Sequence, residues 1–333
     1  MRTRRLVSSL FVLGAVAATA GCAAPAEGEP TLAPDDGSPQ TAASAITAGA
    51  PASAFMRART VEIRTAVSAT EVSGCTGVII GARHVLTAAH CKPAAGKTRV
   101  GFYKSPGIAE PGSIGVTSVV SPPGVHAANG DLNDTNGDFA DIAVLTLASP
   151  IPWYTTPAQL DFSYPGEDAS AMQVGRGLWA SYDNANGVLM FDMNTFYSSS
   201  TSSGFFYMNE NNTAKGDSGG PLFGMNLKLE GILYGSNLIG SWRDLYTSTR
   251  HHMKFILDAM AYTTTSLLLP NTMLEGGTVM SYTFEKSSRI CAYACDTNAQ
   301  CHGFTFLNGS ICVLRSQLSN DVTTYAGAVS GVR

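Results

Sequence analysis

Between Ile46 and about Tyr262 the chain consists of short β-branched and aromatic runs separated by Gly, Pro and Asn, and this pattern leaves few folds open. Such runs are typical of β-strands connected by tight turns, so we expect an all-β body. The clearest runs are 72–80, 97–103, 142–147 and 231–234. Over roughly 250–262 the apolar residues instead follow the 3.6-residue period of a helix that would close this body.

Length and charge narrow the possible functions. The chain has 333 residues, which at about 150 residues per domain corresponds to roughly two domains. It carries 21 Lys and Arg against 25 Asp and Glu, and only 14% of its residues are charged. Because binding to a phosphate backbone needs a surplus of cations, no nucleic-acid partner is expected.

Residues 1–21 have the composition of an export signal. Three arginines lie among the first five residues, and an uncharged apolar run follows from Leu6 to Ala20. This run is shorter than the roughly 20 residues of a membrane-spanning helix, so no integral membrane domain is expected. Cleavage after Ala20 would release a secreted protein, whereas the lipobox-like Thr19-Ala20-Gly21-Cys22 would place a lipid anchor on Cys22 at the cell envelope. Both outcomes stay open.

The remaining sequence divides into three parts. Residues 22–45 are almost wholly Ala, Pro, Gly, Ser, Thr and acids without an aromatic residue, which is typical of a disordered linker or propeptide. Residues 46–264 form the β-rich body. Residues 265–333 form a separate segment that contains four of the seven cysteines.

Three motifs of the β-rich body supply the residue types of a nucleophilic triad. They are Leu86-Thr87-Ala88-Ala89-His90-Cys91, Asp141-Ile142-Ala143-Val144-Leu145 and Gly216-Asp217-Ser218-Gly219-Gly220-Pro221-Leu222. A serine hydroxyl is a weak nucleophile at neutral pH, so it needs a base, and the base needs a carboxylate that orients it and stabilises its charged form. His90, Asp141 and Ser218 are the candidates for these three roles.

The three motifs, in this order, resemble those of the trypsin-like serine endopeptidases of the chymotrypsin fold, over most of residues 46–262. The resemblance implies two six-stranded antiparallel β-barrels with the site between them, His90 and Asp141 coming from the first barrel and Ser218 from the second. It also implies a polypeptide substrate, no metal and no cofactor. Cys75 and Cys91, sixteen residues apart, would form the disulfide that this family has there.

The same resemblance assigns roles around Ser218. The backbone amides of Gly216 and Ser218 would form the oxyanion hole. Asp217 would be a buried carboxylate that needs a partner. Ile46-Thr47-Ala48-Gly49 is similar to the family's Ile-x-x-Gly start, so cleavage after Ala45 would free an ammonium group on Ile46 that pairs with Asp217 in an activated zymogen. The alternative is that Ile46 simply continues the linker.

Substrate specificity is less clear. Where the family places the floor of its primary pocket stands Asn212, an amide, so cleavage after Arg or Lys is not implied. Tyr234-Gly235-Ser236 replaces the family's usual Ser-Trp-Gly, and no cysteine between Cys91 and Cys291 can brace the pocket. Asp244 would either reach the pocket from another wall and attract a basic side chain or lie on the surface.

Two other kinds of site have to be considered. Residues 131–138 contain three carboxylates and two amides around a glycine, which would make either a Ca²⁺ loop or a solvated turn. Gly216-Asp217-Ser218-Gly219-Gly220 also fits the G-x-S-x-G elbow of the α/β-hydrolases. That fold would need Asp244 and His251 or His252 as partners, but the sequence around them lacks an alternating βα pattern.

The C-terminal segment is expected to be held together by disulfides. Cys291, Cys295, Cys301 and Cys312 form an even set in an exported chain, which allows three pairings, with a four-cysteine zinc site as the alternative. Leu274-Glu275-Gly276-Gly277, Cys291-Ala292-Tyr293-Ala294-Cys295 and Cys301-His302-Gly303-Phe304-Thr305-Phe306 resemble the PAN/apple domains. The resemblance implies a small α+β module, the pairs Cys291–Cys312 and Cys295–Cys301, and a protein or carbohydrate ligand.

Together these observations predict an exported serine endopeptidase with a C-terminal binding module. A catalytically weak or inactive homologue that acts as a binding or adhesion protein is the alternative, because the wall at 234–236 departs from the family pattern.

Overall fold

The computed structural model describes residues 46, 49–105, 108–109, 113–161, 165–177, 188–200, 204–237, 243–265, 267–319 and 321–333. The described residues belong to one compact unit, Thr41–Arg333. The export signal, the lipid attachment at Cys22 and the linker predicted for residues 22–45 all lie outside the described residues. No helix of the described part is long and apolar enough to cross a membrane.

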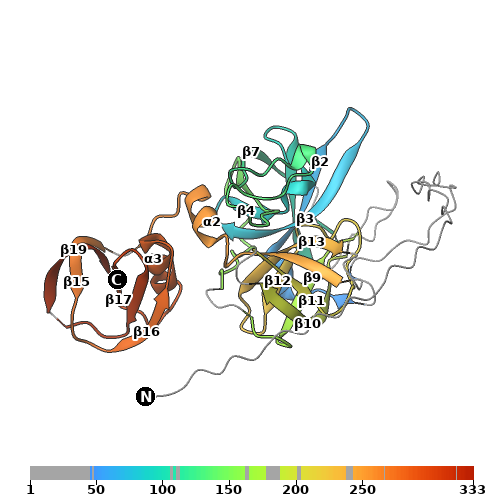
Figure 1. The fold of residues 1–333 in the computed structure, drawn as a ribbon. Helices are drawn as coiled ribbons and strands as arrows, with labels where there is room; N and C mark the ends of the chain where they lie inside the picture. Colours follow the sequence, from blue (N-terminus) through green and yellow to red (C-terminus); the bar gives the residue numbers. More distant parts are fainter. Residues whose placement is uncertain are drawn as a thin grey trace, which may run out of the picture. The chain divides into compact units, whose positions relative to one another are not determined.

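Six strands form the first barrel (Figure 1). They are β2 (Thr60–Ala66), β3 (Val72–Gly81), β4 (His84–Thr87), β5 (Thr98–Ser105), β7 (Ile114–Val120) and β8 (Ala143–Leu147). Their order is β2-β3-β4-β8-β7-β5, and antiparallel pairing of β2 with β5 closes the ring. The two-residue β6 (Ile108–Ala109) extends β5. The interior consists of fully buried aliphatic side chains such as Val61, Ile79 and Leu86.

A second barrel repeats this plan. Its strands are β9 (Ser170–Gly175), β10 (Met190–Ser200), β11 (Phe205–Met208), β12 (Pro221–Gly224), β13 (Leu229–Asn237) and β14 (Arg243–Ser248). The order is β10-β11-β14-β13-β12-β9, closed by pairing of β9 with β10, and the short β1 (Ala50–Pro51) pairs with β10. The all-β body with two six-stranded barrels is confirmed.

Helices are few in this body. They are α1 (Ala54–Arg57), the 3₁₀ turns η1 (Ala89–Cys91) and η2 (Ala127–Asn129), and α2 (Met253–Ala259). The closing helix α2 is shorter than the predicted span of 250–262. His252 is its N-cap, Met260 its C-cap, and Ala261 has a positive φ of 48°, which ends the helical path. Met253, Ile256 and Leu257 form its buried face.

The C-terminal segment is a five-stranded antiparallel sheet with one helix. Its elements are β15 (Leu267–Leu274), β16 (Val279–Phe284), α3 (Ser288–Asp296), β17 (Gly303–Leu307), β18 (Ile311–Arg315) and β19 (Val322–Val332). The strand order is β15-β19-β17-β18-β16. Ser287 caps α3, accepting a hydrogen bond from the amide of Ile290 at 3.3 Å.

All three expected disulfides are present. Cys291–Cys312 joins α3 to β18, and Cys295–Cys301 joins α3 to the turn before β17. The zinc alternative is wrong because each of these four cysteines is paired with another. Cys75–Cys91 joins β3 to η1 in the first barrel.

Helix α3 also packs against the β-rich body. Ile290 and Tyr293 belong to the same buried apolar cluster as the first barrel and α2. The hydroxyl of Tyr293 accepts a hydrogen bond from the amide of Leu160 at 3.1 Å, and its ring contacts that of Tyr262 edge to face. The predicted boundary at 264/265 is therefore bridged by buried contacts.

Candidate active site

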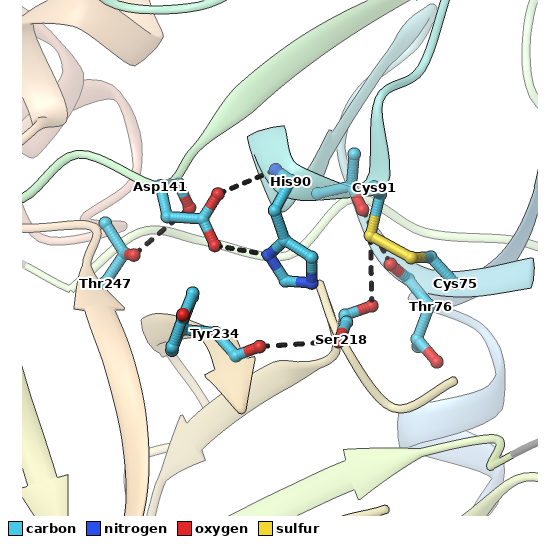
Figure 2. A network of polar contacts seen from close by, with 9 residues as sticks. Cys75, Thr76, His90, Cys91, Asp141, Ser218, Tyr234 and Thr247 are labelled. Carbon is cyan, nitrogen blue, oxygen red and sulfur yellow. Dashed lines mark hydrogen bonds and ion pairs between the residues drawn. A yellow bond between two sulfur atoms is a disulfide. The ribbon is translucent and has the colours of Figure 1, made fainter. Parts of the chain in front are cut away.

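His90 and Asp141 are brought together by two paired strands. His90 lies in η1, directly after β4, and Asp141 comes two residues before β8, the neighbour of β4 in the barrel. The imidazole Nδ1 lies 2.6 Å from Oδ2 of Asp141, and the backbone amide of His90 donates to Oδ1 at 2.8 Å (Figure 2). Asp141 is fully buried, and Thr247 donates to its backbone carbonyl at 3.1 Å. The carboxylate therefore fixes both the position and the tautomer of the histidine.

Ser218 lies on a tight turn that is attached to the first barrel. Thr76 of β3 holds this turn, because its amide donates to the Ser218 carbonyl and its hydroxyl to the Gly216 carbonyl, both at 2.8 Å. Figure 2 shows the imidazole of His90 between Asp141 and Ser218. The Ser218 hydroxyl donates to the carbonyl of Tyr234 at 3.3 Å. The three predicted triad residues thus meet where the two barrels join.

The turn depends on its glycines. Gly216 and Gly219 have φ values of 91° and 80°, which favour glycine. A Cβ at Gly219 would lie 2.2 Å from the Thr87 hydroxyl oxygen and 2.3 Å from the Thr76 carbonyl oxygen. The backbone path that carries the predicted oxyanion amides of Gly216 and Ser218 therefore requires glycine beside the nucleophile.

Asp217 and Ile46, which the zymogen hypothesis pairs, lie close together in the uncleaved chain. The fully buried Asp217 carboxylate accepts hydrogen bonds from the backbone amides of Ile46 at 3.2 Å, Ala214 at 2.8 Å and Gly177 at 2.5 Å. Burial raises the pKa of this carboxyl to about 6, although the three amides oppose the shift. The site stabilises a carboxylate incompletely, since the donors that reach Asp217 from the described residues are neutral backbone amides.

Asn212 and Asp244, both assigned to the primary pocket by the resemblance, lie in contact with each other. The Asp244 carboxylate is fully buried and accepts hydrogen bonds from the Gln173 side chain at 2.9 Å, the Asn212 amide at 3.0 Å and the Thr213 hydroxyl. Because both of its oxygens are engaged inside the protein, Asp244 supports the 212–213 backbone. The alternative that Asp244 lies on the surface is wrong, because its side chain is fully buried.

Sequence reasoning missed the polar residues around Asn212. Its side-chain amide donates to Asp192 at 2.8 Å and to Glu210 at 3.0 Å. Asn194 in turn donates to the oxygen of Gln173 at 3.0 Å. Gln173 is a buried amide between Met172 and Val174 of β9, and this interruption of an apolar run is the signal that the sequence offered.

An open cleft of about 460 Å³ begins at His90. It is lined by His90, Lys92, Ala127, Ala128, Gly130, Leu132, Tyr234 and Gly235. Tyr234 and Gly235, two residues of the 234–236 segment that departs from the family pattern, thus line the cleft. Ser236 lies next along β13, opposite Asp244 in the register of the sheet.

Hydrogen bonds to Asp134 organise the 131–138 loop. Oδ1 of Asp134 accepts from the amides of Asn136 and Asp138 at 2.8 and 3.1 Å. Asp138 pairs with His251 at 2.9 Å, and His252 contacts the Phe139 carbonyl, so neither histidine serves Ser218 as an α/β-hydrolase would require. Among the residues that the structure describes, no three His, Cys, Asp or Glu side chains are grouped to hold a metal ion.

Comparison with known proteins gives a consistent result. The family model Trypsin matches residues 55–256. An inactivated protease paralogue of the scabies mite is similar in structure, with a TM-score of 0.53 and 21% identity over 64% of this chain and 98% of that one. Neuropsin, a serine protease expressed in the limbic system of mouse brain, has a TM-score of 0.51 and 23% identity over 65% of this chain and 100% of its own. At these identities the likeness establishes the fold. No curated protein sequence matches the chain.

Proposed function

The chain belongs to the trypsin family of serine proteases, and from this premise we propose that it is an exported serine endopeptidase in which His90, Asp141 and Ser218 form the catalytic triad. The observation that carries the proposal is the contact of 2.6 Å between His90 and the buried Asp141, beside a serine on a glycine-rich turn. A buried carboxylate that stabilises a charged imidazole is what a serine nucleophile requires.

In the proposed mechanism Ser218 Oγ attacks the peptide carbonyl carbon while Nε2 of His90 takes the hydroxyl proton. The tetrahedral intermediate collapses when His90 gives this proton to the leaving amine, which breaks the C–N bond and leaves an acyl-enzyme. A water molecule, deprotonated by His90, then attacks the acyl carbon. His90 returns this proton to Ser218 Oγ as the acyl C–O bond breaks, which releases the acid product and restores Ser218. Asp141 stabilises the imidazolium at both steps, and the amides of Gly216 and Ser218 hold the negative oxygen.

Activation by cleavage after Ala45 is part of this proposal. The amide of Ile46 already lies 3.2 Å from the Asp217 carboxylate, so a new N-terminus would need little movement to reach it. An ammonium group in place of a neutral amide would add the charge that this buried carboxyl lacks, and would lower its pKa from about 6.

We further propose that the C-terminal segment is a PAN/apple-like module that binds protein or carbohydrate. The sequence motifs support the assignment, and the helix pinned to a small sheet by Cys291–Cys312 and Cys295–Cys301 is consistent with it. Export, either as a secreted or a lipid-anchored protein, follows from the composition of residues 1–21.

The alternative is a weakly active or inactive protease homologue that functions by binding. One observation favours it: the Ser218 hydroxyl donates to the Tyr234 carbonyl, so its proton is directed to an acceptor that is not the base. The hydroxyl would have to rotate toward His90 before attack.

Reaction of the mature chain with a fluorophosphonate probe decides between the two. We expect a covalent adduct at Ser218, located by peptide mass mapping, that is lost in both Ser218→Ala and His90→Ala. A chain whose N-terminus has been processed to Ile46 and that still fails to react would contradict the catalytic proposal and favour the binding-protein alternative.

A further inference from the structure

An edge-to-face row of aromatic rings runs from His90 into the second barrel. The ring centroids of His90 and Tyr234 lie 5.3 Å apart, and those of Tyr234 and Phe139 5.5 Å apart. The row continues to Phe205 at 5.8 Å and from there to Tyr207 at 5.3 Å. Edge-to-face contacts are favourable beyond the burial of the rings, so each ring of the row supports the orientation of its neighbours.

The backbone at Phe139 is held by His252 directly and by His251 through the preceding residue, Asp138. Nε2 of His252 lies 2.9 Å from the Phe139 carbonyl oxygen, and Nε2 of His251 lies 2.9 Å from the carboxylate of Asp138, the preceding residue. Gly204 lies close to the same carbonyl group, because a Cβ atom built on Gly204 would be 2.4 Å from the Phe139 carbonyl oxygen. Burial lowers the pKa of His252 to about 4, so near neutral pH its ring is uncharged and its N–H can serve that carbonyl.

Tyr234 contacts both the proposed base and the proposed nucleophile. Its ring packs against the imidazole of His90, while its carbonyl accepts the hydroxyl of Ser218 at 3.3 Å. Asp141 holds the imidazole only at its Nδ1 edge, and the His90 side chain remains 30% exposed. A planar ring held at one edge can still rotate, and a ring packed on a second side removes that freedom.

The Tyr234 ring stands at a sequence position that differs from the family pattern. The wall resembles a Ser-Trp-Gly segment whose aromatic residue has moved back by one position, to Tyr234. A shift of one residue along a strand reverses the face on which a side chain lies. Tyr234 also sits at an irregularity in the pairing of β13 with β14, between the Leu233 and Gly235 pairs, and such bulges redirect side chains.

We propose that Tyr234 is a positioning residue that orients the His90 imidazole toward Ser218 and is itself held in place by Phe139. This inference rests on the proposed function, because it concerns the geometry of the same triad. It adds that the altered 234–236 wall supports catalysis in this chain.

The test compares Tyr234→Ala, Tyr234→Phe and Phe139→Ala in the activated full chain. Fluorophosphonate labelling of Ser218 and the kcat and KM of a peptide substrate are measured. Displacing a reacting group by about 1 Å costs up to about 100-fold in rate, so we expect Tyr234→Ala to lower labelling and kcat by roughly 10- to 100-fold. Tyr234→Phe keeps the ring and should remain within about threefold of the parent.

Phe139→Ala separates positioning from substrate contact. Phe139 does not belong to the residues that line the cleft at His90. Its loss should therefore reduce kcat and labelling while KM changes little. Tyr282→Ala, at a tyrosine that is 69% exposed in the C-terminal segment, is the matched control and should behave like the parent.

Two results would overturn the inference: unchanged labelling in Tyr234→Ala, or a change confined to KM. If Tyr234→Ala unfolds, as a thermal melt would show, the comparison of Phe139→Leu with Phe139→Ala gives the same decision. A parent chain that does not label at all contradicts the proposed function instead. In that case the NMR signal of the His90 Nδ1 proton still tests the positioning, since it should broaden in Tyr234→Ala and persist in Tyr234→Phe.

Discussion

At the scale of single residues, the site depends on carboxyl groups that are buried with different partners. Asp141 is paired with an imidazole, Asp217 accepts three backbone amides, and Asp244 accepts two amides and a hydroxyl. Burial disfavours a carboxylate unless donors or a positive charge compensate. The chemistry of each aspartate therefore follows from its partner, and each can be tested separately.

Asp141→Asn should remove most of the activity without unfolding the chain. The amide can still contact His90, but it cannot stabilise the imidazolium and it favours the wrong tautomer, so we expect kcat to fall by roughly 10⁴-fold. The measurement is kcat by peptide hydrolysis together with the thermal midpoint. Asp192→Asn, a carboxylate that contacts Asn212 away from the triad, is the comparison variant. Equal losses in the two variants would refute the role of Asp141.

Glu230 should make stability decrease as the pH rises. The residue is 7% exposed, and burial together with nearby Asp161 raises the pKa of its carboxyl from 4.5 to about 8. The folded chain thus binds more protons than the unfolded chain between these values. Its stabilising contribution is present below pH 4.5 and is lost as the pH passes through 8, with a slope of at most about 1.4 kcal/mol per pH unit.

Urea unfolding of the full chain between pH 4.5 and 9 measures this effect. Glu230→Gln should flatten the decline, whereas Glu71→Gln, at an exposed position of the β2–β3 turn, should leave it unchanged. A parental decline that survives Glu230→Gln would show that other groups cause it.

At the scale of elements, one disulfide and one strand fix the positions of His90 and Ser218. Cys75–Cys91 joins β3 to the 3₁₀ turn that carries His90. The same β3 holds the Ser218 turn through Thr76. One strand therefore positions both the base and the nucleophile.

Removing this disulfide should cost stability and activity together. A cross-link across sixteen residues restricts the unfolded chain by about 3 kcal/mol, so Cys75→Ala/Cys91→Ala should lower the free energy of unfolding by that order. Loss of labelling at Ser218 should accompany it, because η1 is no longer tied to β3. Removing Cys295–Cys301, which lies in the C-terminal segment, should reduce stability but leave the labelling rate of the folded chain near the parent's.

Many of the strands, and the three motifs that meet at the site, could be predicted from the sequence. Alternating β-branched runs identified strands such as β3, β5 and β8, and the three motifs identified the residues that meet at the site. The end of α2 could not be predicted, because Met260 and Ala261 continue the apolar period although the backbone leaves the helix at Ala261. The role of Asp244 was hidden because its partner Gln173 is distant in sequence, and no local pattern reports such a pair.

At the scale of the whole molecule, the C-terminal segment and the β-rich body share a buried core. Tyr293 and Ile290 of α3 are 7% and 1% exposed and pack with residues of the first barrel and α2. Asp296 accepts hydrogen bonds from Tyr262 at 2.7 Å and Thr264 at 2.6 Å. These donors lower the pKa of Asp296 despite its burial, so the carboxylate holds the connection between the two parts across the neutral range.

The two parts should consequently unfold in a single transition. Truncating a buried aromatic costs about 3–5 kcal/mol, so Tyr293→Ala should destabilise the β-rich body even though the residue belongs to the C-terminal helix. Calorimetry of the full chain, with fluorophosphonate labelling as a probe of the body alone, measures both effects. Tyr325→Ala, at a 38% exposed tyrosine of β19, is the control and should shift the midpoint little. Two well-separated transitions in the parent, or a body whose labelling midpoint is unaffected by Tyr293→Ala, would mean that the shared core contributes nothing to the protease and that the segment is an independent module.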